Sequence, residues 1–226
     1  MRYISANSIV KKSLLVLSTL CVLFVIQTHL EASTTSVTQY VYYINKKVTS
    51  IVVQENATSE EKKRQMKELF YDNVDLKWIG KFAVGKYWRQ LSDAQKNDYL
   101  NIFPEYVINK YLEHFEDFAT HKLNVTDVTE TSQDEYVVQT TMTDPASQAK
   151  IEVSYRIVKK NDQNTSTFVI FDVMAEGVSM IATQRSEISS YLSNHSFDSL
   201  LMDLKAKIAN SHSSVPDTNS QIKLDK

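Results

Sequence analysis

Apolar and polar side chains alternate without a break in Ile151-Glu152-Val153-Ser154-Tyr155-Arg156-Ile157. Because successive side chains of a strand point to opposite faces, this alternation predicts a strand with one covered face. Neighbouring segments are also rich in β-branched and aromatic residues, and clusters of Ser, Asn and Asp separate them. We therefore expect four antiparallel strands at Lys122–Thr131, Glu135–Thr143, Ala149–Lys159 and Thr167–Ala175.

The last of these segments contains the most apolar run of the predicted sheet, Phe168-Val169-Ile170-Phe171-Asp172-Val173-Met174. Consecutive apolar positions would place apolar side chains on both faces of the strand. A strand that is covered on both faces is typical of the middle of a sheet, so we expect this one to be central.

Helical spacing replaces the alternation on both sides of the predicted sheet. Before it, apolar residues recur three and four positions apart in residues 37–52 and 76–118, with a charged helix after Ser59 between them. After it, two further helical stripes run through residues 178–192 and 197–208. The order of helices, meandering sheet and helices predicts an α+β fold, with the N-terminal and C-terminal helices packed on one face of a four-stranded antiparallel sheet.

Three residues indicate where the helices before the sheet begin or bend. The side-chain oxygens of Asp75 and Ser92 are suited to cap the helices that follow them. Pro104 has no backbone N–H, so we expect it to kink or split the long helix after Ser92.

Residues 1–33 have the features of a secretory signal peptide: two lysines, an apolar run from Leu14 to Ile26, and small residues. The run is shorter than the roughly 20 residues of a membrane-spanning helix, which makes an uncleaved anchor the weaker alternative. Cys21, the only cysteine, lies in this run, so the exported chain would have no disulfide. We expect one domain over residues 34–210 and a disordered tail over residues 211–226.

Several motifs that would support enzymatic chemistry are incomplete. The glycines of Gly80-Lys81-Phe82-Ala83-Val84-Gly85-Lys86 have the spacing of a P-loop, but Tyr87 stands where Ser or Thr would bind magnesium. Gly177-Val178-Ser179 begins like the nucleophile elbow of a hydrolase, but Ile181 replaces its final glycine. No two histidines have metal-ligand spacing, and a net charge of −2 does not indicate nucleic-acid binding.

Acid–base chemistry is a remaining alternative. Asp172 lies in the most apolar strand, and Glu176 follows it closely. A carboxylate buried there could act as a general base on an apolar substrate. The commoner arrangement is structural, in which the carboxylate pairs with a cation such as Arg156 or Arg185.

The apolar and aromatic content is compatible with two kinds of protein interior, a filled core or a cavity. With 12 Tyr, 9 Phe and 2 Trp the chain can form an ordinary filled core, as in a protein that acts only through its surface. The same composition can also line a cavity between sheet and helices. Composition does not distinguish these interiors.

Two pairs of segments carry a more specific pattern. The first pair is Phe70–Asp75 and Ile79–Ser92, with Gln95 and Phe103 beyond them, and the second is Val153–Ile157 and Phe171–Met180, with Arg185 beyond them. Both resemble the toluene-tolerance/MlaC family of periplasmic lipid carriers, with its "lGryWr" helix and its "yDv…EGvSl…R" strand-to-helix junction. The similarity runs from about Thr38 to about Ala209.

This resemblance implies an NTF2/cystatin-like shape with an apolar cavity that takes the acyl tails of a phospholipid. It implies a non-enzymatic carrier in the periplasm, without a cofactor, that moves lipid between inner- and outer-membrane complexes. The implied partners are an inner-membrane ABC transporter with an MCE-domain subunit and an outer-membrane lipoprotein. An enzyme of NTF2-like shape with Asp172 or Glu176 as its base is the second hypothesis.

On this basis we expect the lipid to contact side chains that point inward from the sheet and its flanking helices. Trp88 and Arg89 are expected at the mouth, with Arg89 near a phosphate unless it pairs with Asp93 instead. The full set of expected lipid-binding residues is Phe82, Trp88, Arg89, Tyr106, Tyr111, Tyr155, Ile157, Phe171, Val173, Val178 and Ile181.

Overall fold

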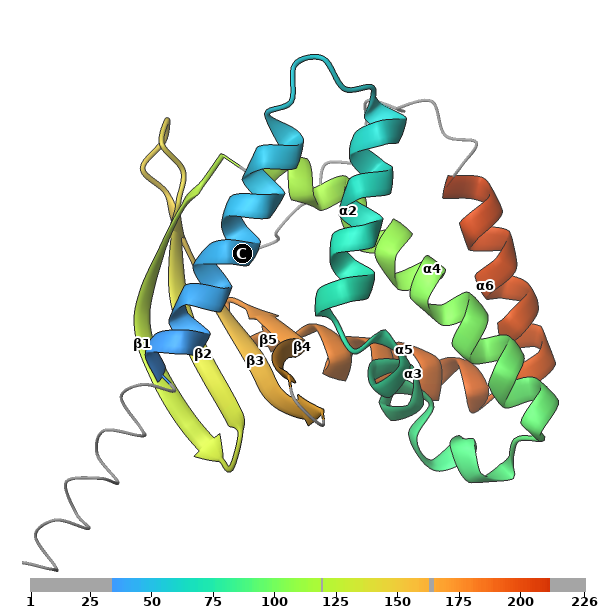
Figure 1. Cartoon of the computed structure of the whole chain (residues 1–226). Coiled ribbons are helices and arrows are strands. Elements are labelled where there is room, and N and C mark those ends of the chain that lie inside the picture. The colour runs from blue at the N-terminus through green and yellow to red at the C-terminus, as the bar shows by residue number, and fades with distance from the viewer. Residues whose placement is uncertain (1–33, 119, 163–164, 212–226) are drawn as a thin grey trace, which may run out of the picture.

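The computed structural model describes residues 34–118, 120–162 and 165–211. The predicted signal peptide lies outside these residues, as does the predicted tail except for Ser211, which ends the last helix. Among the described helices, none is both long enough and apolar enough to cross a membrane. Figure 1 shows an N-terminal helix (34–52), a sheet beside it, and the other helices on one side of that sheet.

The elements follow one another in the order that the sequence predicts. In the first half of the chain these are α2 (Ser59–Asn73), α3 (Leu76–Val84), a 3-10 helix η1 (Gly85–Gln90) and α4 (Asp93–Phe118). In the second half they are β1 (Lys122–Ser132), β2 (Glu135–Thr143), β3 (Lys150–Asp162), β4 (Thr165–Ala175), β5 (Val178–Ser179), α5 (Met180–Leu192) and α6 (Phe197–Ser211). The α+β prediction is confirmed.

The strands form an antiparallel meander in the order β1-β2-β3-β4-β5. The four predicted strands are present, and the two-residue β5 is an addition that the sequence analysis missed. It forms because the chain reverses at Glu176 and Gly177, whose φ angles are +48° and +77°. Positive φ at both central residues is the geometry of a tight hairpin loop, which a glycine adopts without strain.

The expectation that the fourth strand is central was wrong. β4 pairs with β3 along its length, but on its other side it meets the short β5 and, at Ile170, a single bridge from Val74. Its apolar residues are covered on both faces because helices contact both: Trp78 of α3 packs edge-on against Phe171, while Ile170 joins the cluster beneath the N-terminal helix. Packing by helices, not a central position, explains its composition.

A bulge in β4 changes which side chains face the helices. Ile157 of β3 pairs with Ile170, whereas the preceding Arg156 pairs with Asp172, so Phe171 is an extra residue. Residues three apart in a regular strand point to opposite faces. With the bulge between them, Ile170 and Val173 both face the side that the N-terminal helix covers.

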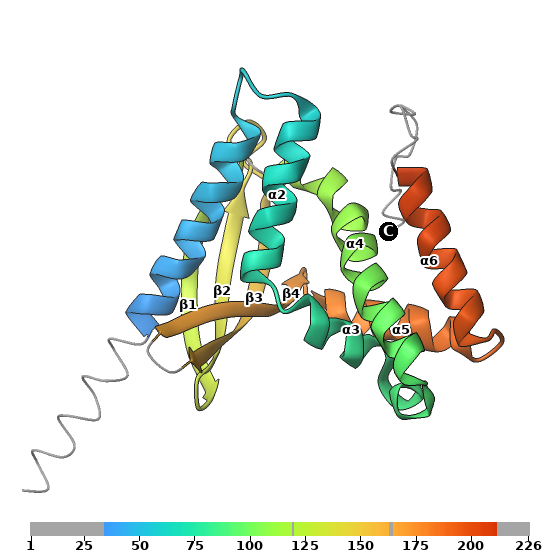
Figure 2. The same cartoon turned by 45° about the vertical axis from the view of Figure 1, so that its right-hand side comes forward.

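Two separate hydrophobic clusters hold the fold together. The first, here called the sheet cluster, joins the start of the N-terminal helix to the sheet and contains Val37, Val41, Tyr136, Val138, Ile157 and Ile170. The second, here called the helix cluster, lies among α3, α4, α5 and α6 and is centred on Tyr99, Phe103, Ile108, Ile181 and Leu200. Figure 2 shows the sheet with its N-terminal helix on one side and α3, α4, α5 and α6 on the other, with α2 between them.

The glycines of the P-loop-like segment serve helix packing. A Cβ on Gly80 would meet the Phe103 ring at 3.0 Å and the Tyr99 ring at 3.3 Å, so its absence lets α3 approach α4 closely. Gly85 follows the last residue of α3, and its N–H donates to the carbonyl of Lys81. The segment is therefore a helix with its C-cap and not a phosphate-binding loop.

The chain between α2 and α3 connects the helices to the sheet. Val74 forms a parallel bridge with Ile170, and the N–H of Asp75 donates to the Ile170 carbonyl at 2.9 Å. Asp75 also caps α3 by accepting from the Trp78 N–H at 3.0 Å, and its carboxylate pairs with Lys160 of β3. The predicted cap at Asp75 is thus confirmed, and it also docks α3 on the sheet.

Two expectations about α4 have different outcomes. Ser92 accepts from the Gln95 N–H and the Gln95 side chain accepts from the Ser92 N–H, so the predicted cap is a reciprocal capping box. Pro104 does not split the helix, which continues to Phe118. It is buried against the packed helices, and neighbouring contacts outweigh the loss of a single backbone hydrogen bond.

The junction between β5 and α5 depends on two hydrogen bonds to one buried carboxylate. Asp172 is only 2% exposed, and its carboxylate accepts from the Ser179 hydroxyl at 2.7 Å and from the Ile181 N–H at 3.2 Å. The Ser179 hydroxyl in turn accepts from the Ala182 N–H at 3.1 Å, so Ser179 is the N-cap of α5. A carboxylate at a helix N-terminus is stabilised by the unpaired N–H groups and by the helix dipole.

We expect Ser179→Ala to lower the free energy of unfolding by about 1–3 kcal/mol, because α5 loses its cap and Asp172 loses a donor. Ser186→Ala, at an exposed position of the same helix, should change it by less than about 0.5 kcal/mol. Urea denaturation of both purified variants measures this difference. Equal stabilities would show that the junction does not depend on Ser179.

Candidate functional site

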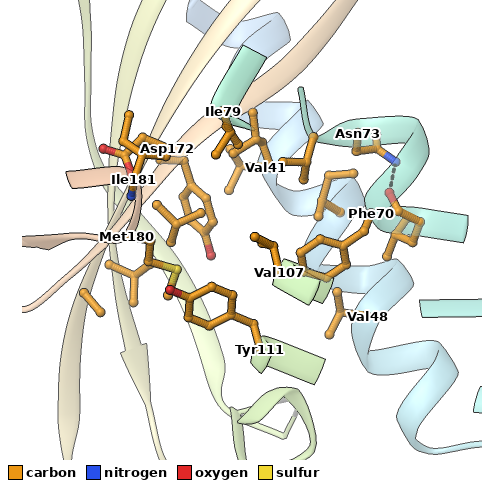
Figure 3. A pocket seen from close by; sticks show the side chains of 18 of the residues that line it. Val41, Val48, Phe70, Asn73, Ile79, Val107, Tyr111, Asp172, Met180 and Ile181 are labelled. Atoms are coloured by element: carbon orange, nitrogen blue, oxygen red, sulfur yellow. Dashed lines mark hydrogen bonds between the residues drawn. The ribbon is translucent and has the colours of Figure 1, made fainter. Parts of the chain in front are cut away.

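A cavity of about 240 Å³ lies between the sheet cluster and the helix cluster. Side chains from the N-terminal helix, α2, α3, α4, α5 and strands β2–β4 line it. In Figure 3, Phe70, Val107 and Tyr111 face the same space from one side, and Met180 and Ile181 from the other. Elements from both halves of the chain therefore enclose one volume.

The sheet contributes one wall through the alternation that its strands have in sequence. Val153 and Tyr155 of β3 face the cavity, and their pairing partners in β4, Ala175 and Val173, lie beside them. Ile170 reaches the same wall because of the bulge at Phe171. Apart from Asp172, whose carboxylate accepts two hydrogen bonds at the start of α5, the side chains of this wall carry no charge.

The N-terminal helix closes the opposite side only in part. Val37 and Val41, in its first turns, are 0% and 3% exposed and pack on the sheet. Further along, Ile44 and Val48 are half-buried and line the cavity. The helix stripe is therefore apolar throughout, but only its first half is matched by the sheet, and the space begins where that match ends.

Asn73, a polar residue at the helix side of the cavity, is satisfied within the chain. The Asn73 amide donates to the Leu69 carbonyl at 2.8 Å, and its side-chain oxygen accepts from the Tyr40 hydroxyl at 3.2 Å. Burial raises the pKa of Tyr40 above its ordinary value, so this hydroxyl stays protonated as a donor. These bonds leave a largely hydrocarbon surface facing the space.

Neither carboxylate of the enzymatic hypothesis has the setting of a general base. Both oxygens of Asp172 accept hydrogen bonds at the start of α5, as described above. Glu176 is exposed and accepts from the Glu152 N–H at 2.7 Å, outside the set of cavity-lining residues. Asp172 forms these bonds rather than the ion pair with Arg156 or Arg185 that the sequence suggested as its structural role.

The described residues also offer no metal centre. Within residues 34–118, 120–162 and 165–211, no three His, Cys, Asp or Glu side chains gather where they could hold an ion. What the cavity can do follows from its lining. An apolar cavity of roughly 150 Å³ stays dry and binds benzene, so a larger one lined by Val, Ile, Leu and Phe can hold hydrocarbon.

Of the residues expected to contact lipid, the structure brings Tyr111, Tyr155, Val173 and Ile181 to the cavity. Ile157 faces the same side of β3 but is fully buried in the sheet cluster. The remaining residues lie away from the cavity wall.

Two of those residues form an aromatic group on α3 and β4. Phe82 stacks on Trp78 with ring centroids 5.3 Å apart, and Phe171 meets the edge of the same indole at 5.4 Å. The guanidinium of Arg185 lies 4.6 Å from the centre of the Phe82 ring. These contacts fix α3 on β4 outside the cavity.

The other four residues are also away from the space. Tyr106 is buried in the helix cluster and Trp88 packs near Tyr99, while Val178 is 62% exposed. Arg89 is exposed on η1, outside the set of cavity-lining residues. Asp93 pairs with Lys96 at 3.2 Å and not with Arg89.

The sequence analysis missed the wall formed by the first two helices. Ile44, Val48, Leu69 and Phe70 line the cavity, although none was expected to. A signal was present, since Val41, Ile44 and Val48 continue the stripe that Val37 begins. Nothing in that stripe indicates that its second half meets empty space.

Comparison with known proteins agrees with this geometry. In fold, the chain is similar to a phospholipid-binding protein from Ralstonia solanacearum solved in complex with a phospholipid: the TM-score is 0.63 at 15% sequence identity, over 76% of this chain and 96% of that one. A sequence model described as "MlaC protein" matches residues 44–206, which is well over half of the chain and includes most of the cavity-lining residues and the junction at Asp172. The chain belongs to the MlaC protein family.

Proposed function

We propose that this protein binds a phospholipid, buries acyl-chain hydrocarbon in the cavity, and carries the lipid across the periplasm between membrane complexes of an Mla-type transport system. The observation that carries the proposal is the apolar cavity of about 240 Å³ between the two hydrophobic clusters of an MlaC-family chain. The phospholipid in the structural relative from Ralstonia solanacearum supports the same ligand class.

The free energy of hydrocarbon in water explains why such a carrier is needed. Each methylene exposed to water costs about 0.8 kcal/mol, and a diacyl lipid has tens of them. A lipid outside a membrane therefore stays bound to any apolar interior that accepts it. Passage from a bilayer into the cavity exchanges one apolar environment for another, so transfer is close to balanced and needs no catalytic residue here.

The cavity volume indicates how the lipid is held. Ligand pockets commonly measure about 300–1,000 Å³, so 240 Å³ accommodates part of a diacyl lipid without rearrangement. The half-buried Ile44, Val48 and Phe70 form the wall that we expect to move outward. Complete burial of two tails would then widen the space between the N-terminal helix, α2 and the sheet.

The cellular setting follows from the sequence together with the family. Residues 1–33 are proposed to direct export and to be removed, leaving the domain in the periplasm. An ABC transporter with an MCE-domain subunit in the inner membrane and a lipoprotein in the outer membrane are the proposed partners. An enzymatic role finds no support in the hydrogen bonding of Asp172 and Glu176.

We expect the protein, purified from the periplasm of an expressing bacterium without added lipid, to contain phospholipid near one molecule per chain. Native mass spectrometry of the protein and chromatography of its organic extract would measure this. Lipid-free protein that also takes up no phospholipid from vesicles would contradict the proposal.

We expect Val173→Phe to lower the bound lipid at least severalfold, because the larger side chain fills the cavity from its sheet wall. The lipid-free variant should be no less stable than the lipid-free parent, since the added carbons enter existing space. Val178→Phe, at an exposed position of β5, is the matched control and should bind as the parent does. Equal lipid content in both variants would show that the ligand lies elsewhere.

A further inference from the structure

Besides Asn45, Asn73 and Asp172, three uncharged polar side chains interrupt the apolar lining of the cavity. Tyr111 comes from α4, Tyr155 from β3 and Gln184 from α5, and all three line the cavity. In Figure 3 the Tyr111 ring points toward Met180, the first residue of α5, and away from Val48 of the N-terminal helix. Tyr111 and Gln184 thus lie at the α5 end of the cavity and Tyr155 lies in the sheet wall, whereas Ile44 and Val48 belong to the wall of the N-terminal helix.

The Tyr155 hydroxyl is a donor that the protein leaves unused. No described residue forms a hydrogen bond with it, although the side chain lies in the cavity wall. Burial raises the pKa of Tyr155 to about 12, so the hydroxyl keeps its proton. A protonated phenol that faces hydrocarbon alone loses the hydrogen bonds it made in water, and this loss is recovered if a ligand supplies an acceptor.

Gln184 orients the second tyrosine. Its side-chain nitrogen donates to the Tyr111 hydroxyl oxygen at 3.1 Å and to a carboxylate oxygen of Glu187 at 3.3 Å. The carboxylate can only accept, so it fixes which end of the amide faces Tyr111. Because the Tyr111 oxygen accepts from Gln184, the Tyr111 proton must point elsewhere, and no described residue accepts it.

Gln184 also has an unpartnered atom of its own. The side chain is 2% exposed, and its carbonyl oxygen has no hydrogen-bond partner. A buried acceptor is destabilising against hydrocarbon, so an acyl tail does not suit this place. The chain of contacts continues through Glu187 to Lys110 at 2.9 Å, and both of these side chains are partly exposed. The chain of contacts that begins at Tyr111 therefore reaches the protein surface.

We infer that Tyr111, Tyr155 and Gln184 form a subsite for the ester-linked glycerol of the lipid, with both tyrosine hydroxyls donating to ester carbonyl oxygens and Gln184 positioning Tyr111. The inference rests on the proposed function. The acyl tails then extend toward Ile44 and Val48, and the headgroup leaves the cavity near the Lys110–Glu187 pair. The ligand class is an ester-linked glycerolipid, since an ether-linked lipid has no carbonyl oxygen at this place.

The test is a competition between two lipids with the same headgroup and chain length, dioleoyl phosphatidylethanolamine and its dialkyl ether counterpart. Purified protein is stripped of lipid, exposed to vesicles that contain both in equal amounts, and analysed by native mass spectrometry. We expect the ester lipid to be bound roughly three- to tenfold more than the ether lipid, as one or two neutral hydrogen bonds would give. Tyr155→Phe and Tyr111→Phe should each reduce this preference while both lipids still bind.

Tyr106→Phe is the matched control, because Tyr106 is a buried tyrosine of α4 outside the set of cavity-lining residues. It should keep the full preference. Equal binding of the two lipids by the parent protein would overturn the subsite and leave the carrier function intact. A preference that survives in both cavity variants would overturn its assignment to these tyrosines. Failure of the parent to bind either lipid would overturn the carrier function as well.

Discussion

The structure depends on an incomplete match between an apolar helix and an apolar sheet face. The N-terminal helix presents one continuous stripe, but the sheet meets only its first half, through Val37 and Val41. Beyond that point α2 and the helix cluster complete the enclosure without filling it. The strand-to-helix junction at Asp172 sets the opposite wall, since it directs α5 away from the sheet with Ile181 and Gln184 facing inward.

The resulting cavity has a thermodynamic consequence for the empty protein. At about 24 cal/mol for each Å³ left unfilled, a volume of this size forgoes packing energy on the order of 6 kcal/mol. Domains of this size are commonly stable by only about 5–15 kcal/mol. The empty protein is therefore less stable than a filled one would be, and any hydrocarbon that enters recovers part of the difference. Ligand affinity and protein stability have the same physical origin here.

The parts of the fold that depend on local patterns could be predicted from the sequence. Alternation identified four strands, and the side chains of Asp75 and Ser92 identified two helix starts, because these signals act over a few residues. The position of β4 in the sheet could not be predicted, since helices that bury both faces of a strand produce the same composition as neighbouring strands.

The cavity could not be predicted from the sequence pattern for a similar reason. Val37 and Ile44 look alike in sequence, yet one is packed and the other borders empty space. Expected contacts such as Trp88 and Tyr106 proved to be core residues of the helical half because aromatic character does not tell which interior a side chain enters.

The extra residue in β4 has an implication for how sequences of this kind can diverge. Phe171 is out of register with β3, and this offset lets Ile170 and Val173 share one face while Asp172 reaches the first turn of α5. Loss of a single codon there would invert every position on one side of the gap, exchanging cavity wall for solvent face. Substitution can be tolerated at many of these positions, but a change in their number cannot. During evolution, the length of the segment between Ile170 and Ser179 should therefore be preserved more strictly than the identity of most residues in it.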